Sequence, residues 1–240
     1  MSVRVRPRKV AVFLLLAALV LTFVSGVAQV MNVLLGAGRH PLLALLFVGQ
    51  DASLPSWFSA VMLLICSVLF VVIAHARVAV ARTRPFYWWG LAVIFLYLSA
   101  DEAISIHEKL SPLGRAMLSI LGAGDFIQRA WVAPAVIVLA VLALLYARFF
   151  LRLPSRIRLL FLLAFGLFFG GAVGLEVSND LYVYLNGGVR DLSVMENVIR
   201  TVVLPHVEEF AEMSGLIVLI YSLLLYAREN FGVYEFRFEK

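Results

Sequence analysis

Residues 10–35 have the sequence VAVFLLLAALVLTFVSGVAQVMNVLL, which contains no charged side chain and is long enough to cross about 30 Å of hydrocarbon as one helix. Five further apolar runs follow along the chain. The sequence therefore predicts an all-α fold: a polytopic membrane bundle of six transmembrane helices, forming a single domain over residues 1–240. We expect the spans near residues 10–35, 57–75, 86–108, 131–150, 157–178 and 204–227.

The composition excludes several classes of protein. Of the 240 residues, 63% are hydrophobic and 15% are charged, which does not suit a soluble globule, a disordered chain, a coiled coil or a repeat solenoid. The single cysteine, Cys66, cannot form a disulfide within the chain. The net charge is +5, but the basic residues lie between the apolar runs, so we expect no nucleic-acid partner.

The distribution of charge predicts the orientation in the membrane. Fourteen of the twenty Lys and Arg residues lie in the two chain ends and in the connections after the second and fourth spans. These segments hold only three of the fifteen acidic residues. By the positive-inside rule we expect both termini in the cytoplasm, with the basic face against anionic lipid headgroups. We expect Trp57, Trp88, Trp89 and Trp131 to be anchors at the membrane interfaces.

The start of the chain also resembles a signal peptide. Basic residues precede the apolar run, and Gly26-Val27-Ala28 could serve as a cleavage site. Because the run is longer than a usual signal core, we expect it to persist as the first span.

Ionisable side chains inside three of the spans are the most informative feature, because charged groups within hydrocarbon are costly. Counting about 1.5 Å of rise per residue from Arg84, Arg158 and Arg228 places the acidic clusters of the third, fifth and sixth spans at one level, about 24–36 Å away. On the third span, Asp101, Ser105 and Glu108 would share one helical face. We therefore predict a single acidic cavity that contains histidine and opens to the outside.

Several carboxylates and two histidines in one cavity cannot all be ionised without a compensating cation, so either a metal ion or protons must be bound. Oxygen ligands with one or two imidazoles suit a divalent metal such as iron, manganese or zinc. The predicted metal ligands are Glu102, His107, Glu176, Glu209 and Glu212. The other candidates are Asp101 and Glu108 as catalytic carboxylates that orient a ligand or act as general base, and His206, Glu208, Asp180 and Arg129 as secondary members of the site.

Simpler explanations exist for some of these residues. Glu208 and Glu209 follow Pro205 in the first turn of a helix, where acids complement the helix dipole. His107 and Glu108 could be solvated residues at the end of the third span. Arg129 could neutralise one carboxylate or bind an anionic headgroup.

The segments SADEAISIHE (residues 99–108), GLE (174–176) and VEEFAEM (207–213), with LPSWF (54–58) upstream, resemble an uncharacterised bacterial family of six-span integral membrane proteins. The similarity runs over most of the chain, and members are sometimes labelled multidrug transporters. It implies a multi-pass protein of the bacterial inner membrane. A looser similarity is to membrane hydrolases of the alkaline-ceramidase type, which bind zinc through histidines and acids. This chain differs from those hydrolases in span number and lacks a His-x-x-x-His pair.

Three functions are consistent with these features. The first is a metal-dependent enzyme acting on a lipid or lipophilic substrate from the outer leaflet, with membrane lipids as its surroundings. The second is a proton- or cation-coupled transporter, for which intramembrane carboxylates are equally natural. The third is a subunit of a membrane complex, or a homo-oligomer, whose polar cavity binds another membrane protein or a pigment.

Overall fold

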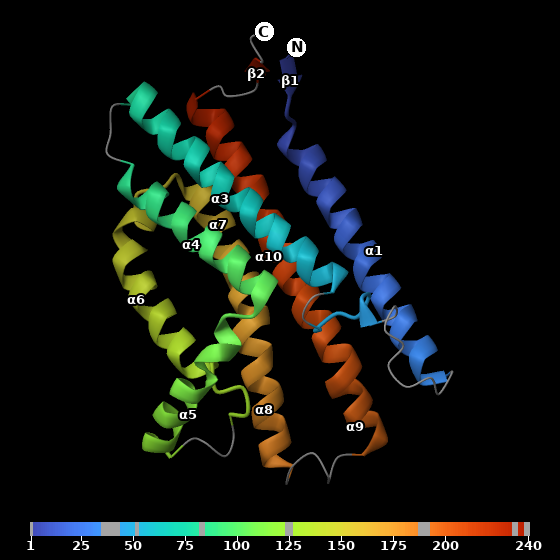
Figure 1. The fold of residues 1–240 in the computed structure, drawn as a ribbon. Helices are drawn as coiled ribbons and strands as arrows, with labels where there is room; N and C mark the ends of the chain where they lie inside the picture. Colours follow the sequence, from blue (N-terminus) through green and yellow to red (C-terminus); the bar gives the residue numbers. More distant parts are fainter. Residues whose placement is uncertain are drawn as a thin grey trace.

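The computed structural model describes residues 2–34, 44–50, 53–81, 85–122, 127–186, 193–231 and 235–237. Long helices run roughly along one direction and form a bundle, with the two chain ends together at one end of it (Figure 1). The helices are α1 (Pro7–Leu34), α3 (Leu54–Ala81), α4 (Phe86–Ile104), η1 (His107–Leu110), α5 (Ser111–Ile120), α6 (Val132–Leu151), α7 (Ser155–Phe169), η2 (Gly170–Leu175), α8 (Glu176–Leu185), α9 (Val194–Val198), η4 (Ile199–Val203) and α10 (Leu204–Phe231).

The chain ends are joined by a small antiparallel pair of strands, β1 (Ser2–Arg4) and β2 (Glu235–Arg237). In this pair Ser2 lies opposite Arg237 and Arg4 opposite Glu235. We call this end of the bundle, which also holds the α6–α7 turn, the terminal end.

The all-helical prediction is confirmed, and the helices agree with a multi-pass membrane protein. Five segments within the described residues are long and apolar enough to cross a membrane, namely Pro7–Met31, Leu54–Ala79, Val132–Leu151, Ser155–Leu185 and Ile199–Phe231. A sixth is counted only if α4 is joined to the helical segment His107–Ile120, which is bent from it by 89°.

The third predicted span, 86–108, is too long by four residues. Helix α4 ends at Ile104 because Ser105 adopts the left-handed conformation, with φ of 50°. An L residue in this conformation cannot continue a right-handed helix. The chain therefore turns sharply into η1 and α5 at the end of the bundle opposite the termini.

The fifth and sixth helical segments, Ser155–Leu185 and Ile199–Phe231, are longer than the predicted spans 157–178 and 204–227. Helix α8 continues to Leu185, and helical structure resumes at Val194. Ser193 caps α9: its hydroxyl accepts the backbone N–H of Glu196, and the Glu196 carboxylate accepts the backbone N–H of Ser193.

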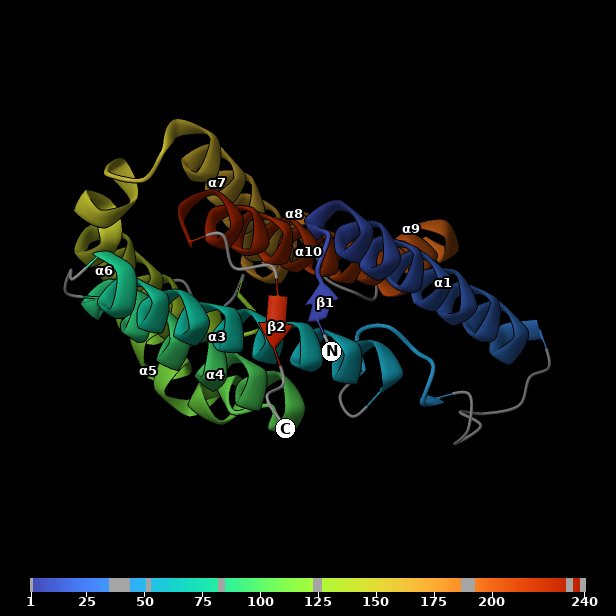
Figure 2. The same ribbon diagram turned by 90° about the horizontal axis from the view of Figure 1, so that it is seen from above.

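Helix α10 is the centre of the bundle and packs against α1, α3 and α7 (Figure 2). Its side chains are buried around most of its circumference in the terminal half, as at Leu216, Leu219, Ile220 and Leu223. Aromatic rings fill the space between α3, α4, α6, α7 and α10 in that half; they belong to Phe70, Trp88, Phe95, Phe149, Phe161, Phe165 and Tyr226.

Trp88 does not anchor an interface as predicted. Only 2% of it is exposed, and its ring stacks on Tyr226 with the centroids 4.9 Å apart. Helix α6 lies at the edge of the bundle, where most of its side chains are exposed.

Candidate functional site

A cavity of about 960 Å³ lies between α4, α6, the α7–η2–α8 helix and α10. One part of its lining is acidic and the other is apolar. The charged and imidazole side chains of the lining are Asp101, Glu102, His107, Glu108, Arg129, Glu176, Glu208, Glu209 and Glu212. The predicted convergence of the third, fifth and sixth spans on one cavity is therefore confirmed, and nine of the eleven candidate residues line it.

Asp101 and His107 form a close pair at the bend that ends α4. The backbone N–H of His107 donates to Asp101 Oδ1 at 2.6 Å, and His107 Nδ1 lies 3.1 Å from Asp101 Oδ2. The His107 ring also packs on Trp131, with 4.6 Å between the centroids. A hydrogen bond from Nδ1–H to the carboxylate leaves Nε2 as the imidazole atom able to accept a proton or bind a metal.

The local structure around this pair differs from the prediction that Asp101, Ser105 and Glu108 share one helical face. Asp101 and Glu108 do not share a face of one helix, because the left-handed Ser105 interrupts the helix between them. The turn instead folds His107 back onto Asp101, and both side chains are mostly buried, with 29% and 15% exposed. The left-handed conformation of Ser105 therefore places His107 beside Asp101 in the cavity lining.

Glu176 and Arg129, which both line the cavity, form an ion pair. Arg129 Nε lies 3.0 Å from Glu176 Oε1, and the side chains are 42% and 12% exposed. Of the two roles expected for Arg129, neutralising a carboxylate is therefore the one observed. The second oxygen, Glu176 Oε2, is buried and has no hydrogen-bond partner among the described residues.

Asp180 does not line the cavity, although it was a secondary candidate. Its Oδ2 accepts the backbone N–H groups of Gln128 and Arg129 at 2.9 and 3.1 Å. The residue is 6% exposed. Asp180 therefore anchors the segment before α6 and places Arg129 beside Glu176.

The carboxyl groups of α10 reach the cavity because η2 approaches α10 closely. A Cβ atom on Gly171 would lie 2.8 Å from Glu212 Cγ and 2.9 Å from the backbone oxygen of Glu208. Glu212 lines the same cavity as Glu102 of α4 and Glu176 at the start of α8, so all three spans contribute carboxyl groups to one cavity.

Two π-helical segments flank this cluster. Segment η2 directly precedes Glu176, and η4 directly precedes α10. Each inserts extra residues into a helical turn and so changes which side chains of the following helix face inward. Neither segment is predicted by the sequence, although the glycines of η2 permit close helix packing.

His206 also lies outside the cavity lining. Its Nδ1 lies 2.6 Å from the backbone oxygen of Val202, and its Nε2 is buried without a partner among the described residues. That nitrogen is 3.7 Å from the place where a Cβ on Gly26 of α1 would be. The imidazole therefore faces α1, away from the carboxyl groups.

The apolar part of the lining extends from the acidic part toward the terminal end. It is formed by side chains of α4, α6 and the α7–η2 junction, among them Ile94, Leu98, Val138, Leu142, Phe168 and Phe169. The apolar side chains were not predicted as part of the site, because in sequence they cannot be told from other residues of a span.

The prediction of a metal-binding cluster is not supported by the present side-chain positions. Within the described parts of the chain, no group of three or more His, Cys, Asp or Glu residues could hold a metal ion. The seven carboxyl groups all line the cavity, but among the described residues no three of them have the spacing of a metal site.

These features define an all-helical bundle with a cavity lined by acidic and apolar side chains, and its long apolar helices are compatible with a multi-pass membrane protein. The chain belongs to the family described as Domain of unknown function (DUF8692), which matches residues 11–227. No curated protein and no solved structure matches the chain.

Proposed function

We propose that this protein is a membrane enzyme that binds an amphiphilic, lipid-like molecule whose cationic head occupies the acidic part of the cavity. The observation that carries the proposal is that one cavity is lined both by seven carboxyl groups and by apolar side chains of α4, α6 and the end of α7. Carboxylates around a low-polarity cavity require compensating cations or protons, and Arg129 is the one arginine of the described lining. A positively charged head would supply the missing charge.

The wide spacing of the carboxyl groups favours an organic cation, such as an ammonium group, over a bare metal ion. A metal ion needs oxygen or nitrogen ligands at about 2.0–2.6 Å, which the described side chains do not offer together. An ammonium head is larger and is bound by several hydrogen bonds to carboxylates at about 2.7–2.9 Å. Glu102, Glu208, Glu209 and Glu212 are the proposed partners of the head.

The apolar wall would hold the tail. Val138 and Leu142 of α6 line the cavity, and so do Phe168 and Phe169 at the end of α7. Because α6 is at the edge of the bundle, a chain could enter from the surrounding lipid beside it. Burial of each methylene group contributes roughly 0.8 kcal/mol, so affinity should rise with chain length.

Asp101 and His107 are the proposed catalytic pair. Asp101 accepts the backbone N–H of His107 at 2.6 Å and lies 3.1 Å from the ring atom Nδ1, and these two contacts orient the imidazole and stabilise its protonated form. His107 Nε2 would take a proton from water or from a substrate hydroxyl beside the head. Glu108, which also lines the cavity, is the second candidate base.

A divalent metal, iron, manganese or zinc, is the second candidate for the cation. The observation in its favour is that a carboxylate on Nδ1 is the usual way in which a metal-binding histidine is oriented. Glu102, Glu176, Glu209 and Glu212 would have to move toward His107 to complete the site. Elemental analysis of the purified protein decides between the two cations.

We also propose that the protein is a multi-pass protein of the bacterial inner membrane with cytoplasmic termini, so that the acidic part of the cavity faces outward. The basic residues at the terminal end support this orientation. We favour catalysis over transport because the terminal half of the bundle is filled by side chains such as Phe70, Phe161 and Leu223, all fully buried.

Binding of dodecylammonium and dodecyl sulfate to the protein in nanodiscs tests the proposal. We expect saturable binding of the cation only, weakened about tenfold or more in the double variant Glu208→Gln/Glu212→Gln, since a tenfold change corresponds to about 1.4 kcal/mol. The control is Glu229→Gln, which removes one carboxylate from the other end of α10. Equal binding of the two amphiphiles would contradict the proposal.

The catalytic pair is tested on a membrane lipid extract, with products followed by mass spectrometry. Asp101→Asn should leave dodecylammonium binding within a few-fold of the wild type but slow turnover about 10- to 100-fold, because the imidazole loses its orienting carboxylate. An unchanged rate in Asp101→Asn, with folding intact, would remove the pair from the mechanism.

A further inference from the structure

The acidic and apolar cavity is closed toward the terminal end of the bundle. Its last lining residues in that direction on α4, α6 and α7 are Val93, Leu142 and Phe168. About one turn further on, α4 and α6 meet, because a Cβ atom on Gly90 would clash with the hydroxyl of Tyr146. Tyr146 is itself buried. The space between α4 and α6 therefore narrows to direct contact just beyond the lining.

Phe165 of α7 closes the remaining side. The centroid of its ring lies 6.4 Å from that of Phe95 on α4, 5.5 Å from that of Phe150 on α6 and 6.1 Å from that of Phe169. Phe169 lines the cavity, whereas Phe165 does not. Aromatic rings from all three helices thus form a floor beneath the lining, and Phe165 is common to these three ring pairs.

The depth of the cavity above this floor follows from the helix rise. On α4, Glu102 and Val93 are nine residues apart, or about 13–14 Å at 1.5 Å per residue. On the helix that runs through α7, η2 and α8, Glu176 and Phe168 are eight residues apart, or about 12 Å. An extended chain advances about 1.2 Å per bond, so both depths match a chain of roughly 10–12 atoms.

We propose that the floor at Phe165 restricts the bound amphiphile to a tail of medium length, about 10–12 carbon atoms. This inference rests on the proposed function, because it takes the cationic head to be held by the carboxyl groups. A shorter tail loses van der Waals contacts with the lining. A longer tail must bend or pull the head away from the carboxyl groups, which costs free energy as overpacking does. Phe165 is therefore a specificity-determining residue remote from the head.

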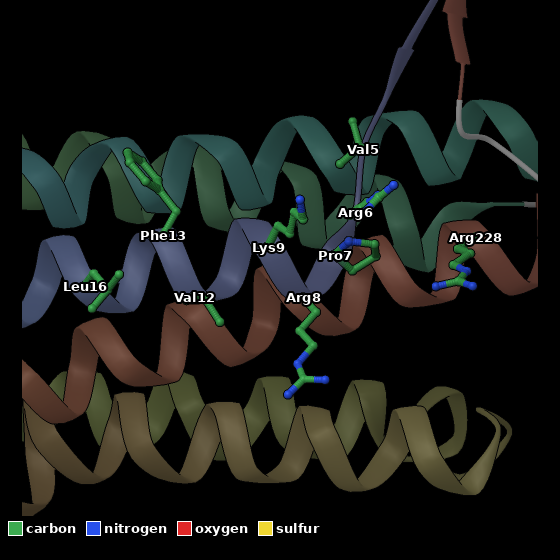
Figure 3. A pocket seen from close by; sticks show the side chains of 9 residues that line it. All are labelled: Val5, Arg6, Pro7, Arg8, Lys9, Val12, Phe13, Leu16 and Arg228. Atoms are coloured by element: carbon green, nitrogen blue, oxygen red, sulfur yellow. The ribbon is translucent and has the colours of Figure 1, made fainter.

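A second cavity, of about 810 Å³, lies at the start of α1 and suits a cationic head poorly. Its described lining includes Arg6, Arg8, Lys9 and Arg228 and no carboxyl group. Figure 3 shows Arg8 and Lys9 on opposite sides of α1. Because basic side chains repel an ammonium group, we expect the end of a bound tail to lie beside α6 and α7 and not beside α1.

Displacement of tritiated dodecylammonium from the full-length protein in nanodiscs measures the length limit. The competitors are alkylammonium ions from hexyl to octadecyl, each expressed as a mole fraction of the lipid, so that partition into the membrane does not affect the comparison. We expect decyl- or dodecylammonium to be the most potent and hexadecylammonium to be at least about fivefold weaker, the lower end of the usual cost of overpacking.

Two outcomes of this measurement contradict different claims. Equal potency from dodecyl to octadecyl, with saturable binding intact, would overturn the length limit and leave the proposed function standing. Absence of saturable dodecylammonium binding would contradict the proposed function and the length limit together.

Two variants should move the preferred length in opposite directions. Phe165→Ala opens space behind Phe169, so the preferred tail should lengthen to tetradecyl or hexadecyl. Leu142→Trp fills the last turn of the lining on α6, so the preferred tail should shorten by about 5 Å, to octyl. Leu142→Trp alone carries the test if Phe165→Ala does not fold.

Phe149→Ala is the matched control, because it removes a partly buried ring of α6 that lies outside the lining and stacks on Tyr87, which also lies outside it. Its preferred tail length should be that of the wild type. A preference that stays unchanged in Phe165→Ala and in Leu142→Trp would overturn the proposal.

Photolabelling locates the end of the tail directly. A diazirine on the last carbon of dodecylammonium should label the peptides that contain Leu142 and Phe169, and an excess of dodecylammonium should suppress the labelling. Suppressible labelling of α1 near Phe13, with none at Leu142 or Phe169, would place the amphiphile in the second cavity and would overturn the proposal.

Discussion

Replacing Gly171 by alanine should separate η2 from α10 and disturb the acidic part of the cavity. The new Cβ atom would lie 2.8 Å from Glu212 Cγ and 2.9 Å from the backbone oxygen of Glu208. The first contact can be relieved by a side-chain rotation, but the second involves backbone and requires the helices to move apart. Overpacking of this kind usually costs about 1–3 kcal/mol.

Gly174→Ala is the matched control, because Gly174 lies in the same π-helical segment and a Cβ there meets nothing within 4 Å. Alanine in a helix gains roughly 0.5–1 kcal/mol over glycine, so this control should be neutral or more stable. Unfolding in mixed micelles with increasing dodecyl sulfate measures both variants. We expect Gly171→Ala to be less stable than Gly174→Ala by at least about 1 kcal/mol and to bind dodecylammonium more weakly. Equal stability of the two variants would refute the close approach of η2 and α10.

Three further predictions concern individual contacts. A double-mutant cycle with Arg129→Gln and Glu176→Gln should give a coupling of about 0.5–3 kcal/mol in the free energy of unfolding; additivity would mean that the 3.0 Å ion pair contributes nothing. Asp180→Ala should speed proteolysis of the segment before α6, because two backbone N–H groups lose their acceptor, whereas cleavage at the wild-type rate would argue against this anchor. Hydrogen bonds from Ser193 and Tyr182 lower the pKa of Glu196 from 4.5 to about 2. Its stabilisation of α9 should therefore be complete above about pH 4.5 and be lost as the pH falls through 2, and an NMR midpoint near 4.5 would refute the cap.

The sequence predicted the bundle and the gathering of acidic residues because both follow from the cost of polar groups in hydrocarbon. That cost depends on depth, which a count of residues along a helix provides. Glu176 and Glu212 are far apart in sequence, yet depth alone placed them in one layer. Their roles in binding or catalysis stay predictions.

The details of the site could not be predicted, because they depend on single backbone conformations and on tertiary packing. The left-handed Ser105 ends α4 early, and no residue pattern distinguishes this serine from one in a continuing helix. Its conformation nevertheless decides that His107 meets Asp101. The orientation of His206 toward α1 depends in the same way on the π-helical η4 that precedes its helix.

Tertiary packing also places Trp88 and Asp180 in surroundings that differ from those predicted from their chemistry. A tryptophan near the end of a span usually anchors an interface, but Trp88 is buried because Phe70, Phe149 and Tyr226 surround it. Asp180 follows the acidic pattern of its helix, yet its carboxylate is used by backbone N–H groups.

The most direct test of the central claim is a cryo-electron microscopy map of the protein in nanodiscs containing dodecylammonium. We predict elongated density in the acidic and apolar cavity, with the head among Glu102, Glu208 and Glu212 and the chain between Leu142 and Phe169. Carboxyl groups that point apart into the surrounding acyl chains, or a filled space between α4, α6 and α10 that admits no amphiphile, would contradict it.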